Sequence, residues 1–169
     1  KILEEPSIKK IGQNMKYDLM IFKKYGINID PVEDTMLLSY TLDAGNNRHN
    51  MDTLSEIHLG HKTISYKEIV GSGKKQLNFS EVNLKDATKY AAEDADITLR
   101  LYNILKNRVD REKLNKIYEV FEKPMVKLLS KLEMNGIKIN DLYLKKLSKK
   151  FEERLLSKEK EIYKISGKE

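Results

Sequence analysis

Cysteine is absent from this sequence, so no disulfide framework can hold the fold together. This absence suits an intracellular protein, and we expect a cytoplasmic location. Long apolar runs are also absent, so no segment is predicted to span a membrane and no membrane partner is expected. The remaining composition, 40% hydrophobic and 34% charged over 169 residues, is enough for one globular domain, or for one domain and part of another.

Arginine is scarce, because only five of the 32 basic residues are Arg and the others are Lys. The net charge of +6 is unevenly distributed along the chain. Residues 1–120 carry 19 basic and 18 acidic residues, whereas residues 121–169 carry 13 and 8. This basic tail could lie along a phosphate backbone, and a solvated helix face explains it equally well.

Hydrophobic spacing predicts a mostly helical chain with two short strands. The strands are expected at residues 8–12 and 31–35, with a helix from Met15 to Tyr25 between them. A strand, a helix and a strand in this order predict a parallel pair. Further helices are expected at residues 36–42, 51–59 and 84–107, from 117 to 135, and after 140. Pro124 would restart or kink the helix from 117 to 135. Asn14, Asn83 and Asn140 are expected as N-terminal caps.

Two of the expected helices each carry an aspartate on their apolar face. Asp94 lies on the apolar stripe of the long helix together with Tyr90, whereas the adjacent Glu93 and Asp96 are expected to face water. Asp18 lies on the apolar face of the first helix. Considered alone, Asp18 is explained by a helix N-terminus and Asp94 by a bond to a backbone group or a lysine. Together with the Tyr90 hydroxyl, they favour a site for a hard divalent cation.

The segments that contain these acids resemble known motifs. I-G-Q-N-M-K-Y-D (residues 11–18) resembles the second exonuclease motif of the proofreading domain of family A bacterial DNA polymerases, and Y-A-A-E-D-A-D (residues 90–96) resembles its third. D-T-M-L-L-S-Y, R-H-N-M-D-T-L and H-K-T-I-S-Y-K-E-I resemble the same family in the same order, and F-E-K-P-M-V-K-L-L-S-K-L-E-M-N-G-I-K-I resembles the start of its polymerase domain. Several segments in one order, over essentially the whole chain, are a specific signal.

The resemblance implies a predominantly helical α/β fold. Residues 1–112 would form a partial ribonuclease H-like exonuclease domain with two parallel strands, and residues 113–169 would form thumb-type helices of the polymerase domain. The parent protein would extend DNA and remove mispaired 3′-terminal nucleotides by hydrolysis with two Mg²⁺ or Mn²⁺ ions. By resemblance, Asp18 and Asp94 would ligate the metals, and Tyr90 would orient the attacking water or help to take its proton.

The resemblance also implies contacts with DNA. Gln13, Asn14 and Tyr66 would lie near a single-stranded 3′ end, with Tyr66 against its terminal bases. Asn14 is equally explained as a helix cap, and Tyr66 as a core aromatic residue. The thumb-type helices would hold duplex DNA through its phosphates.

The chain departs from the family at the first exonuclease motif. This motif, an Asp-x-Glu on an early strand, supplies two of the four metal-binding carboxylates in the family, and this chain is expected to lack it. Half of the metal site and part of the sheet should therefore be missing. We expect the isolated chain to bind divalent metal weakly and to leave DNA intact, whereas the parent protein degrades it.

Two other classes of function stay open. The first is a non-catalytic structural or DNA-gripping module of a family A polymerase, although the inward acids argue against loss of the nuclease site. The second is an unrelated basic helical protein that binds RNA or another protein. This second class leaves the paired inward Asp18 and Asp94 unexplained.

Overall fold

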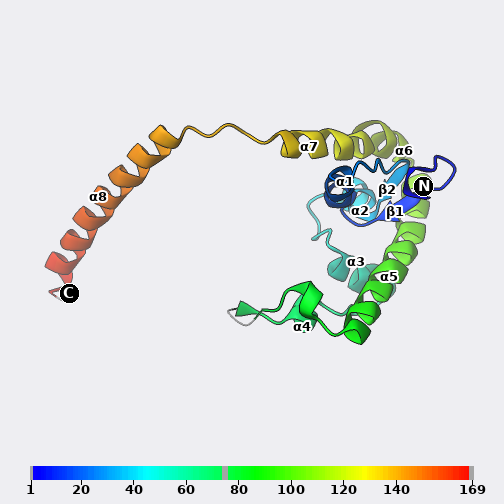
Figure 1. Cartoon of the computed structure of the whole chain (residues 1–169), viewed down its shortest axis with the longest axis horizontal. Helices are drawn as coiled ribbons and strands as arrows, with labels where there is room; N and C mark the ends of the chain where they lie inside the picture. Colours follow the sequence, from blue (N-terminus) through cyan, green and yellow to red (C-terminus); the bar gives the residue numbers. More distant parts are fainter. Residues whose placement is uncertain (1, 74–75, 168–169) are drawn as a thin grey trace. The chain divides into compact units, whose positions relative to one another are not determined.

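The computed structural model describes residues 2–73 and 76–167 as a mostly helical chain (Figure 1). It divides into two compact units, Lys1–Met134 and Asn135–Glu169. Within the described ranges no helix is both long enough and apolar enough to cross a membrane. The elements are a 3₁₀ turn (Ile2–Glu4), β1 (Lys10–Gly12), α1 (Met15–Lys23), β2 (Val32–Asp34), α2 (Thr35–Asp43), α3 (Met51–Leu59), α4 (Tyr66–Val70), a second 3₁₀ turn (Phe79–Glu81), α5 (Leu84–Arg111), α6 (Asn115–Ile117), a π-helical turn (Tyr118–Glu122), α7 (Lys123–Asn135) and α8 (Asp141–Ser166).

The two strands form the parallel pair that the sequence predicts. Lys10 of β1 is opposite Val32 of β2, and Gly12 is opposite Asp34. Each strand is three residues long, shorter than expected, and α1 connects them. Within the described residues β1 pairs with β2 alone, so its other edge is open.

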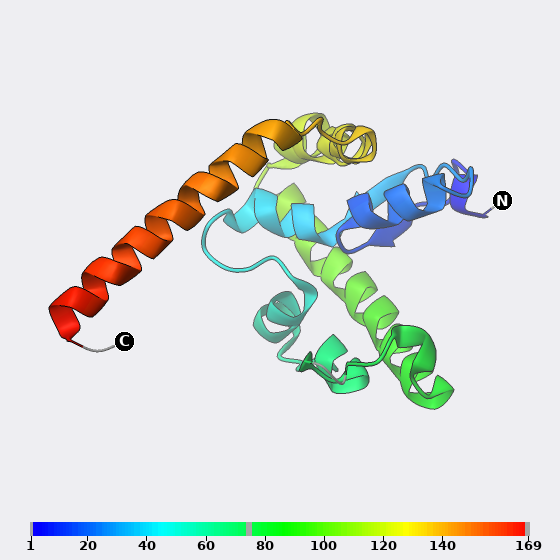
Figure 2. The same cartoon turned by 60° about the vertical axis from the view of Figure 1, so that its left-hand side comes forward.

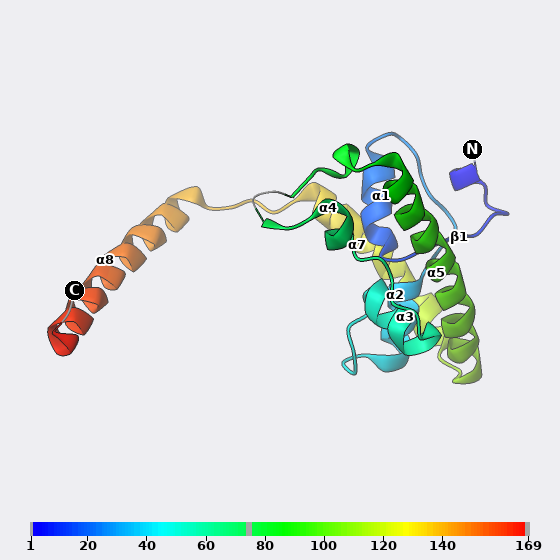
Figure 3. The same cartoon turned by 90° about the horizontal axis from the view of Figure 1, so that it is seen from below.

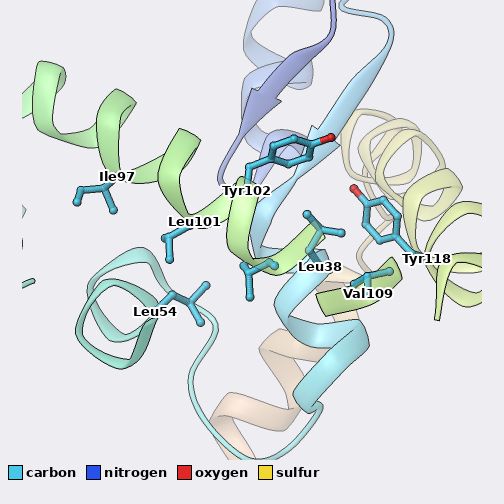
Figure 4. Packing of buried hydrophobic residues seen from close by; sticks show 8 residues of the cluster. Leu38, Leu54, Ile97, Leu101, Tyr102, Val109 and Tyr118 are labelled. Carbon is cyan, nitrogen blue, oxygen red and sulfur yellow. The ribbon is translucent and has the colours of Figure 1, made fainter. Parts of the chain in front are cut away.

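Helix α5 is the element around which the first unit packs. It lies against α2, α3 and β1, and α4 contacts it as well (Figure 2). Leu38 of α2 and Leu54 of α3 are fully buried against it (Figure 4). The three- and four-residue spacing of its apolar side chains produces this buried face, which consists of Ile97, Thr98, Leu101, Tyr102, Leu105 and Val109.

The buried carboxylate of Asp34, at the end of β2, caps two helices. Its Oδ1 accepts hydrogen bonds from Asn14 N (3.0 Å) and Met36 N (2.9 Å), and its Oδ2 accepts one from Met15 N (2.9 Å). These amides begin α1 and α2, where backbone N–H groups have no partner within the helix. The prediction that the Asn14 side chain caps α1 is therefore wrong: Asn14 occupies the cap position with φ of 59°, and its side chain makes no capping bond.

The hydroxyl of Tyr118 supports β2 from the segment that follows α5. It donates to Glu33 Oε2 (2.9 Å) and accepts from the Asp34 backbone N–H (3.1 Å). Lys123 Nζ donates to the other carboxylate oxygen of Glu33 (2.8 Å). Tyr118 and Glu33 are 0% and 3% exposed, and burial raises the pKa of the Tyr118 hydroxyl. A fully buried group of this kind has to be hydrogen-bonded to remain favourable.

The predicted domain boundary near residue 112 lies directly after the end of α5. α5 continues to Arg111, the chain turns at Lys113 with φ of 59°, and α7 packs through Val126 against Val32. Pro124, which was expected to restart or kink a helix, is the second residue of α7, and a π-helical turn directly precedes this helix. The first compact unit thus extends to Met134, and assignment of residues 113–169 to a separate polymerase-type domain stays a prediction.

The second unit consists of an extended segment and α8. Asn140 caps α8 as predicted, since its Oδ1 accepts a hydrogen bond from Tyr143 N (3.0 Å). The helix ends before Gly167, which has φ of 66°. None of its residues is fully buried, as its high content of Lys and Glu indicates.

Replacing Tyr118 with Phe is expected to destabilise the first unit. The change leaves the buried Glu33 carboxylate and the Asp34 amide without their hydroxyl partner, a loss of about 1 to 3 kcal/mol. Urea unfolding followed by circular dichroism measures the difference. Tyr25→Phe is the matched control, because the Tyr25 ring is 78% exposed, and its change should stay within about 0.5 kcal/mol. Equal stabilities of the two variants would contradict the role assigned to the Tyr118 hydroxyl.

Candidate metal and nucleic-acid site

Asp18 and Asp94, the two acids on apolar helix faces, line one open pocket. Asp18 lies in the first turn of α1 and Asp94 in the N-terminal half of α5, and both helices can be followed in Figure 3. The pocket has a volume of about 510 Å³ and is also lined by Gln13 and Lys9. The two acids are 76 residues apart in the sequence, and they line the same cavity.

The pocket gives Asp94 no protein partner for one of its oxygens. Asp94 Oδ1 is buried and has no hydrogen-bond partner in the described part of the chain. Burial raises the pKa of Asp94, the nearby Glu93 charge raises it further, and the Tyr90 hydroxyl opposes them. Burial also raises the pKa of Asp18. An unpartnered buried carboxylate is unfavourable by itself, and a bound cation would satisfy it.

Tyr90 lies one helical turn before Asp94 and interacts with it. Burial and the negative charge of Asp94 raise the pKa of Tyr90 to about 12. The phenol therefore keeps its proton at neutral pH and can donate a hydrogen bond. It also remains an acceptor, so it can hold a water molecule beside the Asp94 carboxylate.

The two carboxylates fit a hard divalent cation in kind but not in number. Across residues 2–73 and 76–167, no three His, Asp or Glu side chains come together in a way that could hold a metal ion. Mg²⁺ prefers six oxygen ligands, so water or further groups would have to complete the shell around Asp18 and Asp94. The described residues therefore offer two possible metal ligands, Asp18 and Asp94, and not a complete set.

The sequence does contain one Asp-x-Glu, Asp110-Arg111-Glu112, but it lies on no strand. It stands at the end of α5, about 24 Å along the helix from Asp94. Asp110 pairs with Lys106 (3.0 Å), and Glu112 pairs with Arg108 (3.1 Å). This acidic pair belongs to the helix end and contributes nothing to the pocket.

The structure separates the two polar residues predicted to lie near a single strand. Gln13 lines the pocket of the two acids, and its side chain is held by the His49 carbonyl (2.7 Å) and the Thr35 hydroxyl. Asn14 lines a different cavity, of about 290 Å³, beside Val126. Gln13 is thus placed with the acids, and Asn14 is not.

Tyr66 is not the core aromatic residue that the sequence left as an alternative. Its side chain is 45% exposed. Its ring lies 6.2 Å from those of Phe79 and Tyr90, measured between centroids. Phe79 was not identified from the sequence as a site residue, and the signal that could have found it is the capped turn in which it lies, N-F-S-E.

Glu93, which was expected to face water, instead ties a loop to α5. Its carboxylate accepts hydrogen bonds from His61 Nε2 (2.8 Å) and from the Ile64 backbone N–H (2.7 Å). Burial alone would raise the pKa of Glu93, but these two partners hold it below its ordinary value. Asp96, with its side chain 64% exposed, faces water as predicted.

A second pocket also borders Asp18. It is lined by Asp18, by Ile11 and Gly12 of β1 and by residues of α1, and the pocket of the two acids also borders Ile11 and Gly12. Both pockets therefore adjoin β1, which has an open edge in the described residues.

The sequence of this chain matches known proteins along nearly its whole length. A family model described as 3′-5′ exonuclease matches residues 1–110. DNA polymerase I of Rhizobium leguminosarum is 45% identical over 166 residues, which are 98% of this chain and 16% of the relative. DNA polymerase I of Borreliella burgdorferi is 40% identical over 166 residues, which are 98% of this chain and 18% of the relative. The chain thus spans less than a fifth of the length of these relatives.

Solved structures show the same fold. Brucella melitensis NrnC with bound Mg²⁺ superimposes with a TM-score of 0.65 at 26% identity, over 80% of this chain and 63% of that one. NrnC bound to pGG gives a TM-score of 0.66 at 24% identity, with the same coverage. The predicted fold, a predominantly helical α/β arrangement of ribonuclease H-like exonuclease type with two parallel strands, is confirmed.

Replacing Asp94 with Asn is expected to stabilise the chain at neutral pH in the presence of EDTA. Because burial raises the pKa of Asp94, ionisation disfavours the folded state, and this cost appears as the pH rises above the ordinary aspartate value of 3.8. The variant should gain about 0.5 to 1 kcal/mol at pH 7 and nothing in acid, where the wild-type carboxyl is protonated in both states.

Urea unfolding at both pH values measures this gain. The control is Asp96→Asn, an exposed acid on the same helix, whose effect should stay within about 0.5 kcal/mol. A loss of stability in Asp94→Asn at pH 7 would show that the Asp94 carboxylate has a stabilising partner.

Proposed function

The chain belongs to the 3′-5′ exonuclease family found in bacterial DNA polymerase I, and we propose that it carries part of a proofreading nuclease site. Asp18 and Asp94 would hold divalent metal, and Tyr90 would position the attacking water. The observation that carries this proposal is the shared pocket of the two acids, in which Asp94 Oδ1 has no protein partner among the described residues.

Carboxylate oxygens are suitable ligands for the proposed metals. Mg²⁺ and Mn²⁺ are hard cations that prefer oxygen, and their charge would offset the cost of burying Asp18 and Asp94. Two such ions, when bound, would activate a water molecule and stabilise the charge that develops at the scissile phosphate. The Mg²⁺ in Brucella NrnC, a neighbour at 26% identity, supports this choice of metal.

Tyr90 would orient the water rather than remove its proton. Its pKa of about 12 keeps the phenol protonated near neutral pH, so it is a poor general base there. Its hydroxyl lies beside the Asp94 carboxylate and would hold a water molecule in place through a hydrogen bond. Gln13, tied to the His49 carbonyl, would form the fixed wall of the same pocket.

A further strand beside β1 would complete the site. In this family the remaining carboxylates come from an Asp-x-Glu on a strand, and here the open edge of β1 adjoins both pockets that contain Asp18. Side chains of a strand paired with that edge would point into these pockets. Because this chain has no Asp-x-Glu on a strand in its described residues, we propose that the chain alone binds metal weakly and leaves DNA intact.

The whole protein would act on DNA in the cytoplasm. The single-stranded 3′ end of a growing strand would enter the pocket, the mispaired terminal nucleotide would be removed, and a polymerase domain would continue synthesis. The alternative of a non-catalytic module predicts no role for the inward acids, and their shared pocket favours the nuclease.

The isolated chain is expected to bind Mn²⁺ weakly through Asp18 and Asp94. Paramagnetic broadening of NMR signals from residues around the pocket measures this binding, and Asp18→Asn should abolish it, because a divalent ion then keeps only one carboxylate. Asp96→Asn is the control and should leave the broadening unchanged. Broadening that is equal in wild type and Asp18→Asn would contradict the proposed metal site.

In the full-length protein, Asp94→Ala is expected to lower the rate of 3′-5′ digestion of a single strand at least about 10²-fold, since ligand loss removes several kcal/mol of transition-state stabilisation. Nucleotide addition should be unaffected. The isolated chain should give no digestion above background. Digestion by the isolated chain that depends on Asp94 would overturn the proposal that its site is incomplete.

The basic C-terminal part suggests a second role, in holding duplex DNA. Residues 121–169 carry 13 basic and 8 acidic residues, and α8 is exposed along its length. Its exposed lysines include the i, i+4 pairs Lys145 with Lys149 and Lys146 with Lys150. We propose that residues 113–169 form a thumb-type arm whose lysines contact backbone phosphates.

Reversing charge on α8 is expected to flatten the salt dependence of duplex binding. Each lost phosphate contact lowers the slope of log K against log salt concentration by about 0.9, so Lys145→Glu with Lys149→Glu should lower it by about 1.8. Titrations at several salt concentrations measure the slope. The control, Lys23→Glu with Lys24→Glu on the first unit, makes the same change in net charge. Equal slopes for the two double variants would contradict the proposal that lysines of α8 contact backbone phosphates.

A further inference from the structure

Another cavity of the first unit is bordered by α1 and α7, two helices that lie side by side in Figures 1 and 3. It has a volume of about 280 Å³ and is lined by residues of α1, of the loop that follows α1 and of α7. Neither Asp18 nor Asp94 lines it, so it is separate from the candidate metal site. A ligand in this cavity would bind without contacting the two acids.

The floor of this cavity is apolar and preformed. It consists of Leu19, Ile27 and Ile29, which belong to a hydrophobic cluster of the core. Ile29 is 4% exposed. The end of the loop is fixed as well, because the Asp30 backbone N–H donates to the Leu3 carbonyl (3.3 Å). Pockets that bind small molecules are usually preformed in this way and mostly apolar.

Three lysines form the rim of the cavity. Lys23 comes from α1, and Lys127 and Lys131 come from successive turns of α7. Lys127 Nζ pairs with Asp30 Oδ1 (2.8 Å), whereas Lys23 and Lys131 make no ion pair with any residue that the structure describes. Three positive charges and one negative charge give the rim a net charge of +2.

The lysines are also the groups that can donate hydrogen bonds to a ligand. The hydroxyl of Ser130, which lines the same cavity, already donates to the Lys127 carbonyl (2.9 Å). Each lysine ammonium has three donors and no acceptor. Like charges at the i, i+4 spacing of Lys127 and Lys131 repel each other, and a bound anion would remove this repulsion. The rim therefore favours an anionic ligand.

The charge of the rim and the size of the cavity restrict the kind of anion. A phosphomonoester carries a charge of about −1.5 to −2 at pH 7, which matches the charge of the rim. A phosphodiester, as in a nucleic-acid backbone, carries a single negative charge and would leave part of the rim unpaired. A cavity of about 280 Å³ is at the lower end of the range for small-molecule sites, roughly 300 to 1,000 Å³. It suits one phosphate and the carbons next to it.

We propose that this cavity is a binding site for a phosphomonoester. Lys23 and Lys131 contact the phosphate from α1 and α7, and the carbons next to the phosphate cover the apolar floor. A free nucleotide and a 5′-phosphorylated strand end both carry this group. Because α1 also carries Asp18, a ligand that binds only the folded chain would stabilise the helix that positions this acid.

The test measures binding of thymidine 5′-monophosphate by NMR titration of the chain, in EDTA and at constant ionic strength. The amide signals of Asn28 and Ser130, which line the cavity, should shift. Lys23→Gln and Lys131→Gln each remove one ammonium group and should raise Kd about three- to tenfold. Lys24→Gln is the matched control, since Lys24 is exposed, adjacent to Lys23 and outside the cavity. Its Kd should stay within about a factor of 1.5 of the wild-type value, because salt screens distant charges.

Two dinucleotides identify the group that binds. The dinucleotide pTpT carries a terminal phosphomonoester, whereas TpT carries a phosphodiester alone. We expect TpT to bind at least about tenfold more weakly than pTpT, because it has less charge to pair with the rim. Binding of pTpT without thymidine 5′-monophosphate would support the site and identify a strand end as its ligand, and the reverse would identify a free nucleotide.

Three results would overturn the site: equal Kd values for Lys23→Gln and Lys24→Gln, equal binding of pTpT and TpT, or no shift with either phosphomonoester. Inorganic phosphate leaves the floor uncovered and should bind more weakly than thymidine 5′-monophosphate, and equal affinity would overturn the role given to the floor. Circular dichroism checks that each variant is folded. The nuclease proposal stands in every case, because Asp18 and Asp94 line other cavities.

Discussion

The carboxylate of Asp34 determines the geometry on which the candidate site depends. It accepts hydrogen bonds from the first amides of α1 and α2, so both helices are fixed to the end of β2. Asp18 lies in the first turn of α1 and is placed beside β1 by that connection. The partial positive charge of two helix N-termini offsets the cost of burying the acid. The Tyr118 hydroxyl, in the segment that follows α5, accepts a hydrogen bond from the backbone N–H of Asp34.

The described carboxylates with buried oxygens are of two kinds. Some have a hydrogen-bond partner on each oxygen and stabilise the fold, and one has a buried oxygen without a partner and marks the candidate site. Asp34 and Glu33 have hydrogen-bond partners on both of their oxygens, and they hold helices and strands together. Asp94 keeps one buried oxygen without a partner in the described residues. Natural proteins accept such a loss of stability where activity requires it. The unsatisfied acid, rather than the number of acids, indicates the site.

Sequence periodicity predicted the elements whose burial follows a regular spacing. The bounds of α3 were predicted to the residue, the parallel pair of strands is present, and the Asp18 and Asp94 side chains reach one pocket. Periodicity reports which face of a helix is buried, but not what lies against it. Glu93 bonds to a loop 29 to 32 residues away, and Phe79 pairs with Tyr66. These contacts join different elements, so the spacing of apolar residues within one helix could not predict them.

The dependence of β2 on Tyr118 and Lys123 has a consequence for how the protein is made. Glu33 is synthesised 85 residues before Tyr118 and 90 before Lys123. At about 5 to 20 residues per second, a ribosome needs about 4 to 17 seconds to add the first of these partners. Throughout that interval the nascent strand carries an acid whose partners do not yet exist. The core of the first unit can therefore close only after translation has passed the end of α5.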